Sequence, residues 1–475
     1  MPDSMKERRP NVLLITADQL REDCVGYSGK YPVRTPHLDR LSEQGVSFSH
    51  AYSVLPVCSP ARQSLLRGRR PETFGALWNY SGALPVMALP PESYTWPRAL
   101  AESGYATAYL GKWGVNPVHG PPAYGYESYV SEAEYQGFVS QKHPDVRYEN
   151  GFFGEECPLP LEDAETHWFA ARAGETLERL QGDGRPWHMA LHFSEPHLPC
   201  RPSAPFAGMY EAADIPEWAG FRETFAGKPY MQRQQLQSWG VAGYGWQEWA
   251  PLVARYYAVI SQLDDAIGRV LGTLERLGMA DDTIVIFTAD HGDMCGSHGM
   301  MDKHYIMYDD VVRVPLIVRM PGGGEAERGW RCERFVYNFL DLPPTILELL
   351  DLQQRDPGDL QGRSLGPLLA GEEPLDWRDA VVSTYNGQQF GLYTSRMIRI
   401  ANWKYIWNLT DVDELYDMTG DPGELKNLSG QADQAELLAA LRRRLYEQLT
   451  LDGDAIVANE WTRRQLLQGA KLGGT

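Results

Sequence analysis

The sequence lacks the features of membrane and nucleic-acid-binding proteins. None of its apolar runs approaches the ~18–20 residues that a membrane-spanning helix needs. It also lacks a basic surplus, because 44 Lys and Arg stand against 63 Asp and Glu and give a formal net charge of −19. A surface that binds nucleic acid or an anionic bilayer needs clustered positive charge. We therefore expect neither a nucleic-acid partner nor a membrane partner.

Cysteine is scarce and shows no pattern of disulfides or metal clusters. Six Cys occur among 475 residues, and no CxxC pair is present. This usage is typical of a reduced chain. The short apolar run 11–17 ends at Asp18 without a small-residue cleavage pattern, so it predicts a strand in place of a signal peptide. The sequence thus favours a cytoplasmic location. Hydrophobic residues make up 43% of the chain, which is enough for a large core.

Apolar, β-branched runs alternate with helical patterns along most of the chain. This alternation predicts an α/β fold with a large, mostly parallel central sheet flanked by helices. The expected strands are 11–17, 107–110, 188–193, 283–289 and 314–319, and the expected helices are 36–44, 59–67, 164–180, 252–277 and 342–350.

A different pattern follows a Gly-, Pro- and charge-rich stretch at 353–377, which is expected to be a linker or loop. Closely spaced short strands and a helix predict a small C-terminal antiparallel sheet with a helix. We expect a catalytic domain over 1–370 and a small α+β subdomain over 371–475. The short strands are expected at 380–385, 397–400, 404–407 and 414–416, and the helix at 434–450.

Two expected strands end in the same letters, Thr-Ala-Asp. Asp18 closes NVLLITAD and Asp290 closes TIVIFTAD, followed by Gln19 and His291 respectively. If the strands are parallel neighbours, these side chains meet at the carboxyl edge of the sheet, where such folds bind ligands. Carboxylate, amide and imidazole ligands suit a hard divalent cation such as Ca²⁺, Mg²⁺ or Mn²⁺. The alternative is that each Asp only caps a turn or helix.

The expected helix after Cys58 has the features of an anion site. Ser59 fits an N-cap and Pro60 the first helical position, which places Cys58 just before a helix N-terminus. Free N–H groups and the helix dipole favour anions there. Arg62 lies about one turn further on and can reach the same anion. The alternative is a structural Cys beside a surface Arg.

Residues 58–62, Cys-Ser-Pro-Ala-Arg, resemble the C-x-P-x-R signature of the type I sulfatases in the alkaline phosphatase superfamily. The runs ITADQ, TADHGD and ELYDMTGDPGELKNL extend the resemblance from about 11 to 428. The resemblance implies that a formylglycine-generating enzyme oxidises Cys58 to formylglycine. Its hydrate would be the nucleophile in sulfate monoester hydrolysis.

The resemblance also implies roles for further residues. Asp18, Gln19, Asp290, His291 and the formylglycine would hold one divalent metal, with Ca²⁺ preferred over Mn²⁺ or Mg²⁺. Gln19 stands where many sulfatases have a second Asp. Arg62 would stabilise the formylglycine hydrate. Asn79 would contact the ester, Lys112 and Lys303 would bind the sulfate, and His197 would bind it and protonate the leaving oxygen.

The chain departs from the family at Gly114. The family often reads Gly-Lys-x-His, and that His acts on the formylglycine when sulfate is released. This chain reads Gly-Lys-Trp-Gly over 111–114. In sequence, His119 and His304 are the nearest candidates for a substitute.

Three functional interpretations follow. The first is a sulfatase acting on a small organic or carbohydrate sulfate, favoured by Gly111-Lys112. The second is a phosphonate monoester or phosphodiester hydrolase of the same superfamily, which the Asp18-Gln19 and Trp78-Asn79 pairs also resemble. The third is a non-catalytic anion-binding relative, suggested by Gly114 alone.

Overall fold

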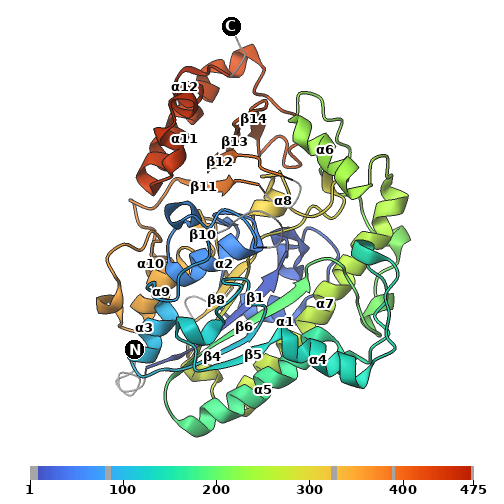
Figure 1. Ribbon diagram of the computed structural model, residues 1–475, viewed down its shortest axis with the longest axis vertical. Coiled ribbons are helices and arrows are strands. Elements are labelled where there is room, and N and C mark those ends of the chain that lie inside the picture. Colours follow the sequence, from blue (N-terminus) through green and yellow to red (C-terminus); the bar gives the residue numbers. More distant parts are fainter. Residues whose placement is uncertain (1–8, 81–86, 323–328, 388–390, 472–475) are drawn as a thin grey trace.

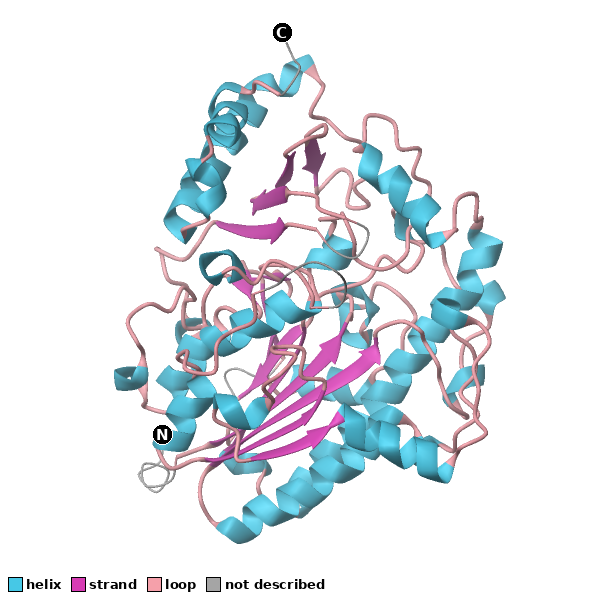
Figure 2. Ribbon diagram, viewed as in Figure 1, coloured by secondary structure: helices cyan, strands magenta, loops and turns pink. Residues whose placement is uncertain are grey.

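The computed structural model describes residues 9–80, 87–322, 329–387 and 391–471. Within these ranges, no helix has both the length and the apolar character to cross a bilayer. The described chain forms a large central sheet with helices on both faces and a smaller sheet near the C-terminus (Figures 1 and 2).

In the described part of the chain, the central sheet has eight strands in the order β5-β4-β6-β1-β7-β8-β2-β9. The pairings are parallel from β5 to β7, whereas β8 runs antiparallel to both of its neighbours. The bounds are Ser128–Ser131 (β5), Ala106–Gly111 (β4), Trp187–Pro196 (β6), Asn11–Asp18 (β1), Thr283–Ala289 (β7), Leu316–Arg319 (β8), Val46–Phe48 (β2) and Trp330–Cys332 (β9). This arrangement confirms the predicted mostly parallel α/β sheet.

The two innermost strands show why the sequence folds this way. Every residue of β1 and β7 is buried, as expected for parallel strands covered on both faces. Their register pairs Asn11 with Thr283 and Ala17 with Ala289. The two strands therefore end side by side.

Helices cover both faces of the sheet. The long helices α5 and α7 pack together on one face, while α2, α3 and α9 lie on the other (Figure 1). The bounds are Pro36–Glu43 (α1), Cys58–Arg67 (α2), Trp96–Glu102 (α3), Glu132–Lys142 (α4), Glu165–Asp183 (α5), Tyr230–Trp239 (α6), Trp246–Arg276 (α7), Asp309–Val312 (α8), Leu342–Leu349 (α9) and Gly366–Leu369 (α10).

The second sheet is antiparallel, in the order β11-β12-β13-β14, as predicted. Its strands are Ala380–Tyr385 (β11), Ser395–Ile400 (β12), Trp403–Asn408 (β13) and Glu414–Asp417 (β14), with helices Ala435–Asp452 (α11) and Glu460–Gln468 (α12). One face packs on α11 through Leu441, Leu445 and Leu449. The other shares an apolar cluster with Tyr52 and Tyr308 of the larger part. The boundary between 370 and 371 stays a prediction.

Some local expectations were wrong. Helix α2 begins at Cys58 with Val57 as its N-cap, so Ser59 is not the cap. The stretch expected as a linker contains the short helix α10. The short strands β2, β5 and β9 were not predicted, nor was the two-stranded pair Ala51–Tyr52 (β3) and Val336–Tyr337 (β10).

Candidate active site

Two strand ends bring the acidic residues together. Asp18 is the last residue of β1, and Asp290 directly follows β7. His291 Nε2 lies 3.8 Å from Asp18 Oδ1 and 3.6 Å from Asp290 Oδ1. One ligand atom from each of Asp18, Cys58, Asp290 and His291 lies within 4.8 Å of the others, and all four residues are buried. The predicted meeting of the two strand ends is confirmed.

Cys58 opens helix α2 at the centre of this cluster. Its Sγ lies 3.2 Å from His291 Nε2, 3.6 Å from Asp18 Oδ1 and 3.9 Å from Lys112 Nζ. Burial and Asp18 raise the pKa of the Cys58 thiol, but Lys112, Lys303 and His291 outweigh them and hold it well below its usual range. These cations therefore favour the thiolate form of the unmodified side chain.

An amide from outside the helix takes the place of the expected cap. Asn79 Oδ1 accepts a hydrogen bond of 2.8 Å from the backbone N–H of Ser59. This satisfies one of the free donors in the first turn of α2. Asn79 thereby lies against the helix end that carries Cys58.

Arg62 links the acidic residues to the strands around them. It is 1% exposed, and it donates from Nη2 to Asp18 Oδ2 at 2.9 Å and from Nε to Asp290 Oδ2 at 3.1 Å. Its Nη1 donates to Lys112 O and to His192 Nδ1, both at 2.9 Å. The outer carboxylate oxygens are thus held by one planar cation, which leaves the Oδ1 atoms facing His291.

A second group of polar side chains joins Lys303 to the site. Lys303 Nζ donates to Gln19 Oε1 at 2.8 Å and lies 2.9 Å from His197 Nε2. His197 Nδ1 lies 2.6 Å from Leu198 O, so this nitrogen carries the hydrogen and Nε2 accepts from Lys303. On the opposite side, Lys112 Nζ pairs with Asp18 Oδ2 at 2.7 Å.

The donor set fits a hard divalent cation. Two carboxylates and one imidazole converge, and His291 Nδ1 bonds Gly292 O at 2.9 Å, which turns Nε2 inward as metal-bound imidazoles require. Gln19 is placed differently, because its amide oxygen accepts from Lys303 and its nitrogen donates to Asp293 and Asp302. Its role as a metal ligand stays a prediction.

Comparison with known proteins agrees with this geometry. The sequence model of the Sulfatase family matches residues 10–352, and that of the N-sulphoglucosamine sulphohydrolase C-terminal region matches 296–450. The first match alone covers more than half of the chain. The chain belongs to the sulfatase family.

Its relatives include both sulfatases and a broader hydrolase. The chain is 29% identical to an ulvan-active sulfatase of Formosa agariphila, over 92% of this chain and 81% of that one. It is 30% identical to PehA, a multifunctional alkaline phosphatase superfamily protein of Trinickia caryophylli, over 90% and 93%. A phosphonate monoester hydrolase of Agrobacterium radiobacter superposes with a TM-score of 0.80 at 26% identity, covering 94% and 96%. The family match, and not these two hydrolases, identifies the chain as a sulfuric ester hydrolase.

The sulfatase site also contains residues that sequence reasoning missed. His192 of β6 accepts from Arg62, and its Nε2 is buried with no hydrogen-bond partner in the part of the chain that the structure describes. Burial and the nearby Arg62 hold the pKa of His192 well below its usual value, so the ring is neutral. In the pairing of β6 with β1, His192 lies opposite Thr16, two residues before Asp18. That pairing is the signal that could have identified His192.

Both substitute histidines make contacts with residues other than Cys58. His119 is exposed, and its carbonyl accepts from Trp113 Nε1. His304 is buried, with Nε2 2.8 Å from Asp302 Oδ2. Gly114 has a φ of 64°, and a Cβ there would lie 3.0 Å from Arg62 Cδ. Glycine at this position therefore leaves Arg62 undisturbed.

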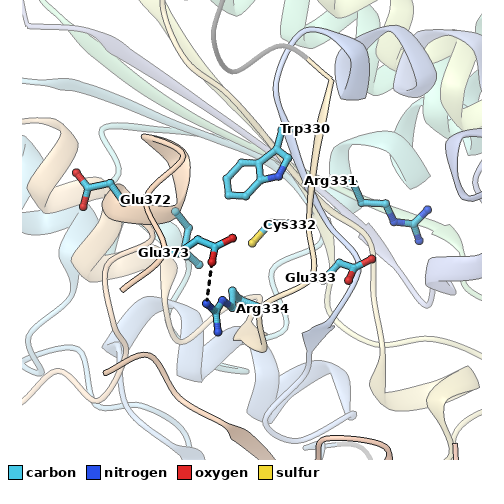
Figure 3. Close-up of a pocket in the computed structure, with 8 residues that line it drawn as sticks. Trp330, Arg331, Cys332, Glu333, Arg334, Glu372 and Glu373 are labelled. Atoms are coloured by element: carbon cyan, nitrogen blue, oxygen red, sulfur yellow. Dashed lines mark hydrogen bonds and ion pairs between the residues drawn. The ribbon is translucent and has the colours of Figure 1, made fainter. Parts of the chain in front are cut away.

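A hollow of about 430 Å³ lies away from this sulfatase site, at the sheet edge formed by β9. Trp330, Cys332 and Arg334 line it, and Arg334 pairs with Glu373 across it at 3.5 Å (Figure 3). None of the predicted site residues lines this hollow.

Proposed function

We propose that the protein hydrolyses the sulfate monoester of a small organic or carbohydrate substrate through a formylglycine made from Cys58. The observation that carries the proposal is the position of Cys58 at the start of α2, with Sγ near Asp18, His291 and Lys112. A formylglycine hydrate supplies a second hydroxyl, which lets the nucleophile regenerate an aldehyde after sulfate leaves. A divalent metal held by Asp18, Asp290 and His291, with Gln19 as a further ligand, would supply a Lewis acid beside that hydroxyl.

The remaining side chains have separate roles in this proposal. Arg62 fixes the two carboxylates by bonding their outer oxygens. Lys112 and Lys303 neutralise the sulfate oxygens as charge develops on them. Asn79 lies beside the ester at the helix end. The Lys303–His197 pair, 2.9 Å apart, holds a proton for the leaving oxygen.

A second candidate is hydrolysis of phosphonate monoesters or phosphodiesters. The likeness to a phosphonate monoester hydrolase and to the multifunctional PehA supports it. The neutral Gln19, where many sulfatases have an Asp, also suits this alternative. Lys112, paired with Asp18 at the edge of the cluster, favours the sulfate ester.

Paired initial-rate assays separate the two candidates. Protein with verified formylglycine is given 4-nitrophenyl sulfate, bis(4-nitrophenyl) phosphate and 4-nitrophenyl phenylphosphonate, with the Cys58→Ala protein as the control. We expect the highest kcat/KM for the sulfate and no turnover by the control. A higher value for either phosphorus ester would replace the first candidate by the second.

A further inference from the structure

A cavity of about 260 Å³ opens beside the proposed sulfate-binding residues. Lys112 and His197 line it together with the end of β6 and the start of α5. Because both residues also belong to the candidate active site, an alcohol still attached to sulfate would extend into this cavity. Its volume is below the ~300–1,000 Å³ of pockets for drug-sized ligands, which indicates a small leaving group.

Two carboxylates face this cavity next to the anion-binding groups. Glu165 opens α5, and Glu195 lies near the end of β6. Ser194 Oγ donates to Glu132 Oε1 at 3.1 Å, and burial and this third carboxylate both raise the pKa of Glu165. Glu195 lies against Thr166, whose hydrogen bonds oppose the rise in the Glu195 pKa. The second oxygen of Glu195, Oε2, is buried with no hydrogen-bond partner among the described residues. One buried acceptor is therefore left for a ligand that donates a hydrogen bond.

Neither Glu165 nor Glu195 forms an ion pair with another described residue, although Lys112 lowers the pKa of Glu165 from a distance. Lys112 pairs with Asp18, and Arg201, which also lines the cavity, stacks on Tyr148 with 3.8 Å between its Cζ and the ring centroid. Burial raises the pKa of both groups, to about 7 for Glu165, and Glu165 adds to the rise for Glu195. The pair is thus costly to ionise until a positive charge enters.

The location of this pair constrains the ligand. When they are ionised, carboxylates beside a sulfate site repel an anionic substrate, and a neutral hydroxyl does not relieve that repulsion. A positive charge on the leaving group relieves the repulsion, and an ammonium group can also donate a hydrogen bond to Oε2 of Glu195.

We propose that Glu165 and Glu195 bind a protonated amine on the leaving group, so that the preferred substrate is the sulfate ester of a small amino alcohol or amino sugar. This inference rests on the proposed function, because it places the sulfate at Lys112 and His197. Arg201 also lines the cavity and is not needed for the amine.

The test compares sulfate esters that differ only in an amine or a hydroxyl. The pairs are 2-aminoethyl and 2-hydroxyethyl sulfate, and glucosamine and glucose sulfated at O3 or O6, with 4-nitrophenyl sulfate as the reference. We expect kcat/KM to favour the amine at least about tenfold in one pair, as a charged hydrogen bond gives. Glu165→Gln and Glu195→Gln should each remove most of that preference without lowering the rate on the reference, because neither variant adds negative charge to the cavity.

Glu162→Gln is the matched control, since Glu162 is exposed and pairs with Arg269 outside the cavity. Circular dichroism confirms that each variant is folded. If the reference is hydrolysed but no pair favours the amine, the inference is wrong and the proposed function stands.

If verified formylglycine protein hydrolyses none of the esters, the proposed function is wrong. Calorimetric binding of the same ester pairs to the Cys58→Ala protein then decides the inference independently. Tighter binding of an amino ester supports it, and equal affinities across every pair overturn it.

Discussion

At the residue scale, Arg62 determines how the candidate site is arranged. Its guanidinium bonds both aspartates, the Lys112 carbonyl and the His192 ring from one buried position. A lysine could not replace it, because an ammonium group lacks the planar arrangement of a guanidinium and has only three donors for these four partners. Arg62 therefore sets the spacing between β1, β7 and α2 at the candidate site.

Gly114→Ala tests how closely the site depends on the space around Arg62. An added Cβ would lie 3.0 Å from Arg62 Cδ at a φ of 64°. We expect the free energy of unfolding to fall by about 1–2 kcal/mol, because of the left-handed backbone, and kcat/KM to fall as well. Gly104→Ala is the control, since Gly104 also has a positive φ but open space around it. Equal effects of both variants on activity would contradict this account.

His197→Ala tests the proposed proton donor. We expect kcat to fall by about 10²–10⁴ on an alkyl sulfate, whose leaving oxygen needs a proton, and by less on 4-nitrophenyl sulfate. Steady-state kinetics on both esters measure the difference. His119→Ala, an exposed position, should change neither rate. The same loss on both esters would show that His197 does not protonate the leaving group.

At the residue scale, the sequence predicts which side chains lie together where a motif fixes its own geometry. Cys58 and Arg62 are one helical turn apart, so a helix brings them to the same site whatever the rest of the fold does. His192, Glu165 and Glu195 carry no such local signal. Their positions depend on the register of β6 and on the packing of α5, which only the folded chain defines.

At the element scale, the site is built from the ends of β1 and β7 and the start of α2. Both strands are continuous buried apolar runs, a strong signal that made their bounds and their meeting predictable. Strands β2 and β9 have three residues each, too few for a period to appear in the sequence. The cap of α2 was also unpredictable, because its acceptor comes from Asn79, 20 residues away.

The meeting of two strand ends predicts a metal effect on stability. A divalent cation that binds the folded cluster but not the unfolded chain should raise the melting temperature of chelator-treated protein. At a free cation concentration of 100 times Kd, the free energy of unfolding should rise by about 2.7 kcal/mol. Thermal melts with Ca²⁺, Mn²⁺ and Mg²⁺ rank the three ions. In Asp290→Asn the rise should disappear. Identical melts of the native protein with and without each ion would contradict the metal site.

At the scale of the whole molecule, charge is distributed unevenly. The chain has a net charge of −19, yet Arg62, Lys112 and Lys303 converge around one cysteine. An anionic substrate therefore meets general repulsion, which these three cations and a bound divalent metal would offset at the site. This contrast favours small esters that reach the site over extended polyanions.

Buried neutral histidines predict a loss of stability in acid. Burial lowers the pKa of His188 to about 3, whereas an unfolded histidine has a pKa of about 6.5. The unfolded chain then binds the extra proton first, so stability falls as pH decreases from about 6.5 toward 3, by about 2 kcal/mol at pH 5 for this residue. Denaturant melts at several pH values measure the slope. His188→Gln should flatten it, and an unchanged slope would exclude His188 as a source.

The most direct test of the central claim is the mass of the tryptic peptide 41–62, which contains Cys58. The protein is produced together with a formylglycine-generating enzyme and digested, and the peptide mass is measured. The account predicts an aldehyde in place of the thiol at Cys58. A peptide that retains the unmodified thiol under these conditions would contradict a formylglycine nucleophile.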